Sequence, residues 1–418
     1  MSRSLRRRTP TGARRASSAS IVALVGALLV SLAASTATAA TPPHLTGASS
    51  MSIYLTGVAA VPGGTGAWAV GFANSSSPPY DDAPVMWKWS GSKWATEPIP
   101  SLGKDGSLTA VAATSASNAW ALGLSGPSSS TADPVLLHWN GVAWTIVKFP
   151  SSDDTDYFEY MAASGAGVFV AGGTNGSTSH PLLLGYMKAR WTAEKLPALP
   201  LNTDLGALSA TSASPSGLWA TAISCVSSLC TSSVLKPDKS GWSLVSVAGK
   251  GASLTGLAAL SSTHVLVVGE AGAKAGTFGK LLIERSKGSS WTAMKAASSI
   301  ATGTLSSADL SSPIRGWAAG DTETDTATAV LVDRLEGSTW SATKVKIPGK
   351  NGLLIAFSAE SASSAWLFAR SYTGKVCLSP STIVAERWSG SSWSVVKTPP
   401  LTLGAAVPLT VPAIEPHC

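Results

Sequence analysis

The sequence predicts an all-β fold: a seven-bladed β-propeller of four-stranded blades, preceded by a cleaved signal peptide. Three observations lead to this prediction. The N-terminal segment has the composition of a secretion signal, turn residues recur about every 8 to 12 positions, and a unit of about 50 residues repeats along the chain.

The first 40 residues predict export. They contain six arginines and no acidic residue, and an apolar run from Ile21 to Ala34 is followed by an Ala-Thr-Ala sequence ending at Ala39. This order is typical of a signal peptide, here residues 1–40 with cleavage after Ala39 or Ala40, so we expect a secreted protein. A membrane anchor is the alternative, but so short an apolar run does not span a hydrocarbon core of about 30 Å. No second long apolar stretch follows, so we expect no membrane span in the mature form.

The basic character of the chain belongs to that segment. The whole sequence has 30 Lys and Arg against 23 Asp and Glu, and 24 against 23 remain once the six N-terminal arginines are removed. A nearly neutral mature chain lacks the basic surface that binds phosphate backbones, so we expect no nucleic-acid partner.

Two aromatic columns define the repeat. The first closes a short apolar strand and recurs every 47 to 52 residues, at Trp68, Trp120, Phe169, Trp219, Leu266, Trp317 and Trp366. The second opens another strand and recurs every 47 to 53 residues, at Trp94, Trp144, Trp191, Trp242, Trp291, Trp340 and Trp393. Because two independent columns keep one period seven times, each repeat is a structural unit.

Each repeat contains four short strands. In the second repeat they cover residues 108–114, 119–123, 134–139 and 143–148, and an Asn-Gly turn of the kind that favours tight hairpins joins the last two. The first strand is rich in small residues and suits a narrow hub, whereas the fourth carries lysine and ends in proline, as an outer edge should. Such units arranged radially give a propeller, with a solenoid as the alternative.

The predicted organisation follows from these strands. After the signal peptide we expect an N-terminal extension over 41–53, the propeller over 54–399, and a C-terminal tail over 400–418. The seven repeats cover about 54–100, 107–150, 157–197, 205–248, 253–295, 304–347 and 352–399.

The repeat resembles two known propeller types. Its period, with an apolar strand that ends in glycine and a later tryptophan, is similar to kelch and galactose-oxidase-like propellers, although a paired glycine occurs once, at Gly172-Gly173. The Gly-x-x-Trp hairpin, as at Gly141 to Trp144, is similar to the Asp-box of sialidase-like propellers, but Trp139 stands where that motif has aspartate. The resemblance covers about residues 54–399 and implies architecture, not activity. Export and a composition biased to Ala, Gly, Ser and Arg also resemble an actinobacterial protein.

The four cysteines predict disulfides, because their number is even and the protein is expected outside the cell. Cys225 and Cys230 lie in one loop of the fourth repeat, Cys377 lies in the matching loop of the seventh, and Cys418 is the last residue. We expect the bridges Cys225–Cys230 and Cys377–Cys418, the second tying the tail to the last blade. Metal binding is the alternative.

No catalytic constellation is evident. A galactose-oxidase-like copper site needs grouped Tyr and His ligands, and a sialidase-like site needs three grouped arginines, but these residues are scattered here. His138 falls in a repeat column with basic residues, which indicates a structural role: Lys88, Arg285, Arg334 and Arg387. Acids precede the last three, and we expect these neighbours to form ion pairs between strands or blades: Glu284, Asp333 and Glu386.

Loop lengths give the clearest positional signal. Loops between second and third strands share one face with the connections between blades, and here they are long and varied, as at 73–83, 124–133 and 370–381. We call this end the long-loop face and expect binding there. The candidate ligand-binding residues are Tyr80, Asp81, Asp82, Asp133, Tyr157 and Tyr372.

Two acidic clusters on the same face have the alternate spacing that can direct several oxygens toward calcium. They are Asp153, Asp154 and Asp156, and Asp321, Glu323 and Asp325. Neither matches a complete calcium loop, so a solvated loop is the preferred interpretation and no cofactor is expected.

The sequence therefore favours a secreted, non-catalytic binding module that contacts a glycan, peptide or protein through the long-loop face. A carbohydrate-active propeller enzyme, sialidase-like or galactose-oxidase-like, and a lectin are the alternatives, because propeller sites assemble from several blades. A convergence of acids with Arg or His at the mouth of the hub would favour the enzyme.

Overall fold

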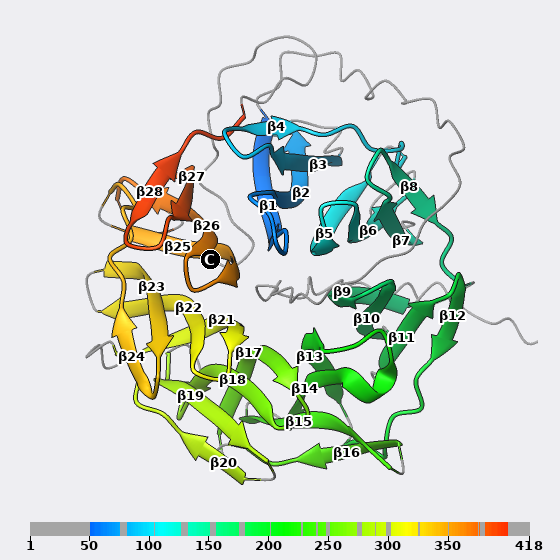
Figure 1. The fold of residues 1–418 in the computed structure, drawn as a ribbon, viewed down its shortest axis with the longest axis vertical. Coiled ribbons are helices and arrows are strands. Elements are labelled where there is room, and N and C mark those ends of the chain that lie inside the picture. Colours follow the sequence, from blue (N-terminus) through cyan, green and yellow to red (C-terminus); the bar gives the residue numbers. More distant parts are fainter. Residues whose placement is uncertain are drawn as a thin grey trace, which may run out of the picture.

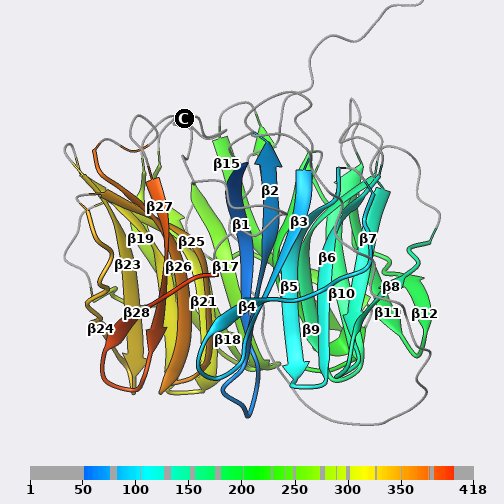
Figure 2. The same ribbon diagram turned by 90° about the horizontal axis from the view of Figure 1, so that it is seen from above.

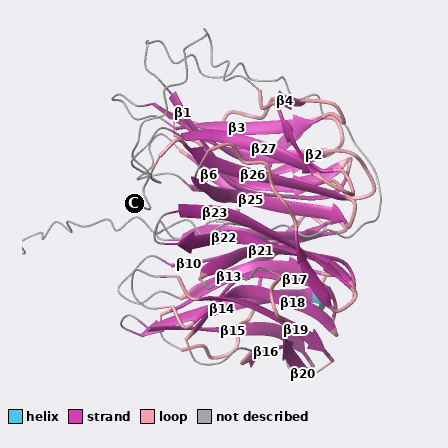
Figure 3. Ribbon diagram, turned by 90° about the vertical axis from the view of Figure 1, so that its left-hand side faces the viewer, coloured by secondary structure: helices cyan, strands magenta, loops and turns pink. Residues whose placement is uncertain are grey.

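The computed structural model describes residues 51–75, 82–103, 105–126, 133–150, 156–174, 180–200, 202–226, 229–239, 241–247, 251–273, 278–288, 290–297, 302–324, 327–349, 351–374, 376 and 381–399. Within them, seven four-stranded antiparallel sheets stand around a central axis (Figure 1), which confirms the predicted all-β, seven-bladed propeller. The strands run along that axis (Figure 2), and the described elements are strands apart from one 3₁₀ turn, η1 (Pro215–Gly217) (Figure 3). The predicted signal peptide and C-terminal tail lie outside the described residues.

Each blade contributes one strand to each of four layers, counted outward from the hub. The innermost strands are β1 (Met51–Ala60), β5 (Ser107–Ser115), β9 (Asp156–Ser164), β13 (Thr203–Ala210), β17 (Ala252–Ser261), β21 (Gly303–Ser312) and β25 (Asn351–Ser361). The second strands are β2 (Ala67–Ser75), β6 (Asn118–Ser125), β10 (Gly167–Thr174), β14 (Leu218–Val226), β18 (His264–Ala271), β22 (Arg315–Thr324) and β26 (Ser364–Tyr372). The third strands are β3 (Asp82–Trp89), β7 (Asp133–Trp139), β11 (Pro181–Met187), β15 (Leu229–Asp238), β19 (Lys280–Lys287), β23 (Ala327–Glu336) and β27 (Ser381–Trp388). The outer strands are β4 (Trp94–Thr96), β8 (Trp144–Val147), β12 (Arg190–Ala193), β16 (Gly241–Val245), β20 (Ser290–Ala293), β24 (Thr339–Ala342) and β28 (Trp393–Val396).

Every inner strand carries a β-bulge where it pairs with the second strand of its blade. Where a blade has a glycine three positions after its first-column residue, this glycine lies beside the bulge. Gly71 pairs with Leu55, and a Cβ at Gly71 would overlap the carbonyl oxygen of Tyr54. The repeated glycine therefore permits the close approach of the bulged backbone.

Tryptophan residues pack between neighbouring blades, and at some junctions a cation lies between their rings. The Lys88 ammonium of blade 1 is 4.9 Å from the ring centroid of Trp68, its cross-strand neighbour, and 4.1 Å from that of Trp139 in blade 2. Arg334 of blade 6 lies in the same way between Trp317 and Trp388, with its guanidinium carbon 5.7 Å from each centroid. This cation–aromatic sandwich is attractive because the ring faces are electron-rich.

The same sandwich closes the ring. Blade 1 is built from β1 to β4 and blade 7 from β25 to β28, so among the described strands none is exchanged between the first and last blades. Arg387 of blade 7 instead stacks between its neighbour Trp366, at 5.6 Å, and Trp89 of blade 1, at 5.8 Å. Trp366 also packs edge-on against Trp89 and Trp94, with centroids 4.8 and 4.9 Å apart. Aromatic and cation–aromatic packing therefore joins the two ends of the propeller.

Hydrogen bonds between inner strands complete each junction at the hub. The Ser209 hydroxyl of blade 4 accepts from the Ala259 amide of blade 5 at 2.9 Å, and Ser358 of blade 7 accepts from Ala60 of blade 1 at 3.1 Å. Asp309 holds the equivalent position in blade 6, where its Oδ2 accepts from the Ala359 amide at 2.6 Å. Burial raises the pKa of Asp309 well above its usual range.

The predicted ion pairs between neighbouring acidic and basic residues are replaced by two separate interactions. Both carboxylate oxygens of Glu386 accept from the Lys346 amide of blade 6, at 2.8 and 2.9 Å, and Asp333 accepts from the Ala297 amide of blade 5 at 2.8 Å. Neighbouring residues on a strand point to opposite faces of the sheet, so each acid faces the preceding blade while the arginine beside it faces the next. The acid and the arginine of each neighbouring pair therefore face different blades and do not pair with each other, although the Glu386 charge does interact with Lys346 across the junction.

Replacing Arg387 with alanine tests the closure. We expect Arg387→Ala to lower the free energy of unfolding by about 1–3 kcal/mol, because two ring contacts are lost at a junction that has no shared strand. Urea denaturation of the two proteins measures the difference. Arg315→Ala is the matched control, since Arg315 is an exposed arginine and should change stability by about 0.5 kcal/mol or less. Equal effects of the two substitutions would contradict a role for Arg387 in closure.

Candidate functional site

The antiparallel order of each blade brings the predicted site residues to one end of the propeller. Inner and third strands begin at this end, and second strands end there. The loops between second and third strands therefore lie at this end, which is the long-loop face. The predicted residues found there are spread over five blades: Asp82, Asp133, Asp156, Tyr157, Asp321, Glu323 and Tyr372. Others lie outside the described residues: Tyr80, Asp81, Asp153, Asp154, Asp325, Cys377 and Cys418.

Three of the predicted ligand-binding residues have clearly different surroundings. Asp82 accepts from the Asn74 amide group at 2.5 Å, and its backbone N–H donates to Asp105 at 3.2 Å, so it braces the end of blade 1. Asp133 is exposed at the start of β7. Tyr372 is only 1% exposed and packs inside blade 7 rather than presenting its ring to solvent.

Tyr157 belongs to a compact group at the mouth of the hub. Tyr157 of β9 and Asp204 of β13 hold equivalent positions in blades 3 and 4, each one residue before the bulge pair. The Tyr157 hydroxyl donates to Asp204 Oδ1 at 3.2 Å. Glu159 is the bulged residue of β9, and Tyr160 follows it. We call Tyr157, Glu159, Tyr160 and Asp204 the mouth cluster; Asp204 is exposed and the other three are half-buried.

Burial and neighbouring charges raise the pKa values of two groups in the mouth cluster. Burial raises the pKa of the Glu159 carboxyl, and the nearby charge of Asp204 raises it further. Burial also raises the pKa of the Tyr160 hydroxyl, with a smaller contribution from the Glu159 charge. Glu159 therefore holds a proton more readily than an exposed glutamate, while Asp204 supplies acceptor oxygens at the surface.

The bulge position of Glu159 carries a hydroxyl in other blades. Thr56 of blade 1 donates to the Leu108 carbonyl of blade 2 at 2.9 Å, and Thr255 of blade 5 donates to the Leu305 carbonyl of blade 6 at 2.5 Å. A carboxyl group at this position can donate in the same direction only while protonated, so blade 3 has a titratable group where blades 1 and 5 have a neutral donor.

Sequence reasoning identified Tyr157 and missed Glu159 and Asp204. The signal was present in the repeat, because aligning the inner strands sets Phe158-Glu159 beside Leu55-Thr56 and Leu254-Thr255. A single acid in a column whose other members are uncharged marks a blade that differs from its neighbours.

The predicted calcium ligands are only partly described. Asp321 Oδ1 accepts from the Leu354 amide of blade 7 at 2.7 Å, so one of its oxygens already joins two blades. Glu323 is exposed. Within the described ranges, no three His, Cys, Asp or Glu side chains are grouped so that they could hold a metal ion. The calcium hypothesis stays a prediction.

His138 is committed to the fold. Its ring stacks on Trp120 with centroids 4.0 Å apart, and its Nε2 lies 2.7 Å from Asn118 Oδ1. Burial lowers the pKa of His138, so the ring is neutral near pH 7. His138 thus takes the place of the stacked cation between blades 2 and 3.

Comparison with known proteins shows the fold and not the function. No protein-family model matches the chain, and no curated protein matches it in sequence. Among solved structures, the chain is similar to the β-propeller domain of the Trilobed protease from Pyrococcus furiosus, at 6% identity and a TM-score of 0.52, covering 82% of this chain and 95% of that one. It is similar to YCF48 from Cyanidioschyzon merolae, at 10% identity and a TM-score of 0.50, covering 77% and 96%. It is also similar to the GH74 xyloglucanase from Xanthomonas campestris, at 13% identity and a TM-score of 0.53, covering 81% of this chain and 52% of that one.

Replacing Asp321 with asparagine tests how protonation of this carboxyl affects the stability of the junction between blades 6 and 7. Burial raises the pKa of Asp321 to about 7, so the folded protein binds this proton more tightly than the unfolded chain does. Its contribution to stability is full below about pH 4 and is lost as the pH rises to about 7. Asp321→Asn keeps the oxygen acceptor for Leu354 and removes the titration. We expect the variant to gain stability relative to wild type by up to about 1.4 kcal/mol per pH unit across that window.

Urea denaturation at pH 4, 5, 6, 7 and 8 measures this difference. Glu323→Gln is the matched control, because Glu323 is exposed in the same strand and its loss should leave the pH profile unchanged. A stability difference between Asp321→Asn and wild type that does not vary with pH would refute the assignment.

Proposed function

We propose that this chain is a secreted, non-catalytic binding module that takes its ligand at the mouth cluster on the long-loop face. The observation that supports it most is the hydrogen bond between Tyr157 of blade 3 and Asp204 of blade 4. It joins an aromatic ring and an exposed carboxylate on two rigid inner strands, at the end where the long loops lie. Binding residues on such a frame need little reordering when a ligand arrives.

Polar groups away from the mouth support the same proposal, because they serve the fold. Asp309 and Glu386 accept backbone amides from the adjoining blades, and His138 is stacked on Trp120. These groups are therefore engaged in joining strands and blades. The mouth cluster differs because Asp204 is exposed and Tyr157 is half-buried.

The chemistry of the mouth cluster favours a ligand rich in hydrogen-bond donors. Carboxylate oxygens accept from sugar hydroxyls and from the ammonium or guanidinium groups of a peptide. Tyrosine adds a flat apolar surface with a polar tip. A glycan or a basic segment of a peptide or protein matches this combination.

Thermal unfolding with candidate ligands tests the proposal. A ligand at 100 times its dissociation constant stabilises the fold by about 2.7 kcal/mol, which raises the unfolding temperature measurably. We expect a glycan or a lysine-rich peptide to give this shift with wild type. Asp204→Asn should bind at least about tenfold more weakly, because a charge-assisted hydrogen bond is lost.

Tyr157→Phe and Tyr54→Phe form a matched pair for the same experiment. Both tyrosines precede the bulge in an inner strand, but Tyr54 lies in blade 1, stacked on Phe72 with centroids 5.2 Å apart. We expect Tyr157→Phe to weaken binding and Tyr54→Phe to leave it unchanged. Binding that is unaffected by both Asp204→Asn and Tyr157→Phe would place the ligand elsewhere.

A carbohydrate-active enzyme is the second candidate, and one observation favours it. Glu159 and Asp204 are neighbouring carboxyl groups, and burial together with the charge of Asp204 raises the pKa of Glu159. Glycosidases use such a pair, with one carboxyl protonated as the acid. Under this alternative, wild type releases reducing sugar from a polysaccharide and Glu159→Gln does not, while both still bind it. Binding without release of product supports the non-catalytic module.

Mass spectrometry tests the proposed export and disulfides together. Register pairs Cys225 directly with Cys230 across the β14–β15 hairpin. Opposed residues in antiparallel strands have Cα atoms about 4.5–5.5 Å apart, which lies within the range that a disulfide spans. We expect the exported protein to lack its first 39 or 40 residues and to yield non-reduced peptides linked as Cys225–Cys230 and Cys377–Cys418. Free thiols or crossed pairs would overturn the pairing.

A further inference from the structure

A basic groove lies between blades 6 and 7, on the face opposite the long-loop face. It has a volume of about 660 Å³ and runs between the outer strand β24 and the hairpin that joins β27 to β28. Its lining includes three cationic side chains, an indole and two serines: Arg334, Lys344, Lys346, Trp388, Ser391 and Ser392. The groove is separate from the mouth cluster and does not depend on the function proposed there.

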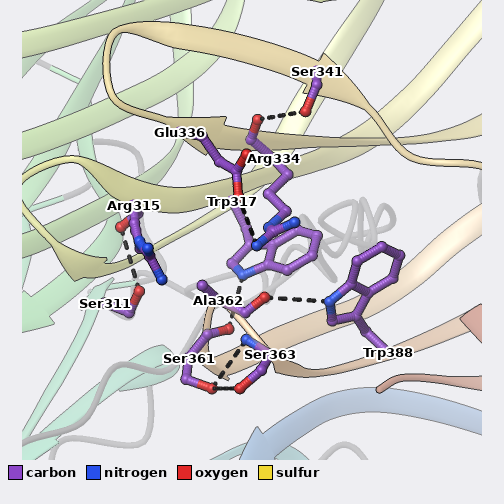
Figure 4. Close-up of polar contacts among 10 residues, drawn as sticks. All are labelled: Ser311, Arg315, Trp317, Arg334, Glu336, Ser341, Ser361, Ala362, Ser363 and Trp388. Atoms are coloured by element: carbon purple, nitrogen blue, oxygen red, sulfur yellow. Dashed lines mark hydrogen bonds and ion pairs between the residues drawn. The ribbon is translucent and has the colours of Figure 1, made fainter. Parts of the chain in front are cut away.

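Arg334 is held rigidly at the floor of the groove. Its guanidinium lies between Trp317 and Trp388, and its Nη2 is 2.8 Å from Glu336 (Figure 4). Both indoles are fixed in turn, because the Trp317 N–H donates to the Ser361 carbonyl at 3.0 Å and the Trp388 N–H donates to the Ala362 carbonyl at 3.2 Å (Figure 4). A cation fixed in this way needs no reordering to meet an anion.

The two lysines carry charge at the rim. Lys344 and Lys346 are exposed, and the backbone of Lys346 is anchored by the buried carboxylate of Glu386. Glu336 pairs with Arg334, and the buried carboxylate of Glu386 interacts with the charge of Lys346. The ammonium groups of both lysines therefore face solvent beside a fixed arginine.

Blade 6 differs here from the other blades. A lysine stands four residues after the second-column tryptophan in five of the seven repeats, at Lys148, Lys195, Lys295, Lys344 and Lys397. These single lysines suit exposed edge strands, which charged side chains protect from aggregation. Blade 6 adds Lys346 two residues later, and so has three cations where blades 5 and 7 have two, the column arginine and one lysine.

We propose that this groove binds an acidic polysaccharide, through carboxylate or sulfate groups on the sugar rings. Three cations complement the anionic groups, and the exposed hydroxyls of Ser391 and Ser392 can bond to sugar hydroxyls. Trp388 is only 6% exposed, so the groove offers no open ring face on which a nucleobase could stack.

Binding of defined polymers to the full chain tests the assignment. The probes are dextran sulfate and polygalacturonate as acidic polysaccharides, neutral dextran, and polyglutamate as an acidic peptide. We expect wild type to bind both acidic polysaccharides and neither of the other two, with affinity that falls as salt rises. Lys344→Ala/Lys346→Ala should bind about tenfold more weakly, since two exposed charge contacts are lost.

Lys148→Ala/Lys195→Ala is the matched control, because it removes the same charge from equivalent exposed positions of blades 2 and 3. It should bind as wild type does. Ser391→Glu adds a carboxylate at an exposed position of the groove and should also weaken binding. Equal affinities of the groove and control variants would overturn the site, and tight binding of polyglutamate would overturn the choice of polysaccharide.

Discussion

The sandwich of a cation between two tryptophan rings is the interaction on which closure of this propeller depends, and it recurs at two other junctions among the described residues. A four-stranded sheet with apolar residues on both faces is not stable alone, so each blade relies on its neighbours. The chain makes all four strands of blade 1 from its N-terminal side and all four of blade 7 from its C-terminal side. Closure therefore uses the same contact as other junctions, with Arg387 between Trp366 and Trp89. Hydrogen bonds at the hub, such as the one that the Ala60 amide donates to the Ser358 hydroxyl, fix the relative orientation of blades that also pack against each other.

The fold could be predicted because its main determinants repeat. The first-column residue and the cation after it are cross-strand partners, as with Trp317 and Arg334, so both appear at a fixed interval in the sequence. Their contact across blades was not predictable in the same way. An acid beside an arginine suggests an ion pair when only the order of residues is known. On a strand the two side chains face different blades, which is why Glu386 meets the backbone of blade 6 while Arg387 meets the rings of blade 1.

The site was less predictable than the fold, for a physical reason. The mouth cluster joins β9 to β13, and Tyr157 and Asp204 come together because they hold equivalent positions in adjacent blades. Glu159 lies in a bulge, and a bulge inserts one residue that period-two reasoning assigns to the wrong face. Long loops drew attention to the end of the molecule where the mouth cluster lies. The residues that meet there, however, belong to the inner strands that the repeat had marked as structural.

Functional residues in a repeat fold are best sought where the residue of one blade differs from the residues at the same position in other blades. Such differences are of two kinds, according to whether the side chain is buried or lies at the surface. Asp309 replaces the serine of blades 4 and 7 at a buried junction, where it accepts the same amide and takes on a raised pKa as a consequence of burial. Such a change affects stability and its dependence on pH. Glu159 and Lys346 depart from their columns at the surface or at its margin. Threonine holds the position of Glu159 in blades 1 and 5, and the other blades lack the second lysine. Their chemistry is therefore free to meet a ligand.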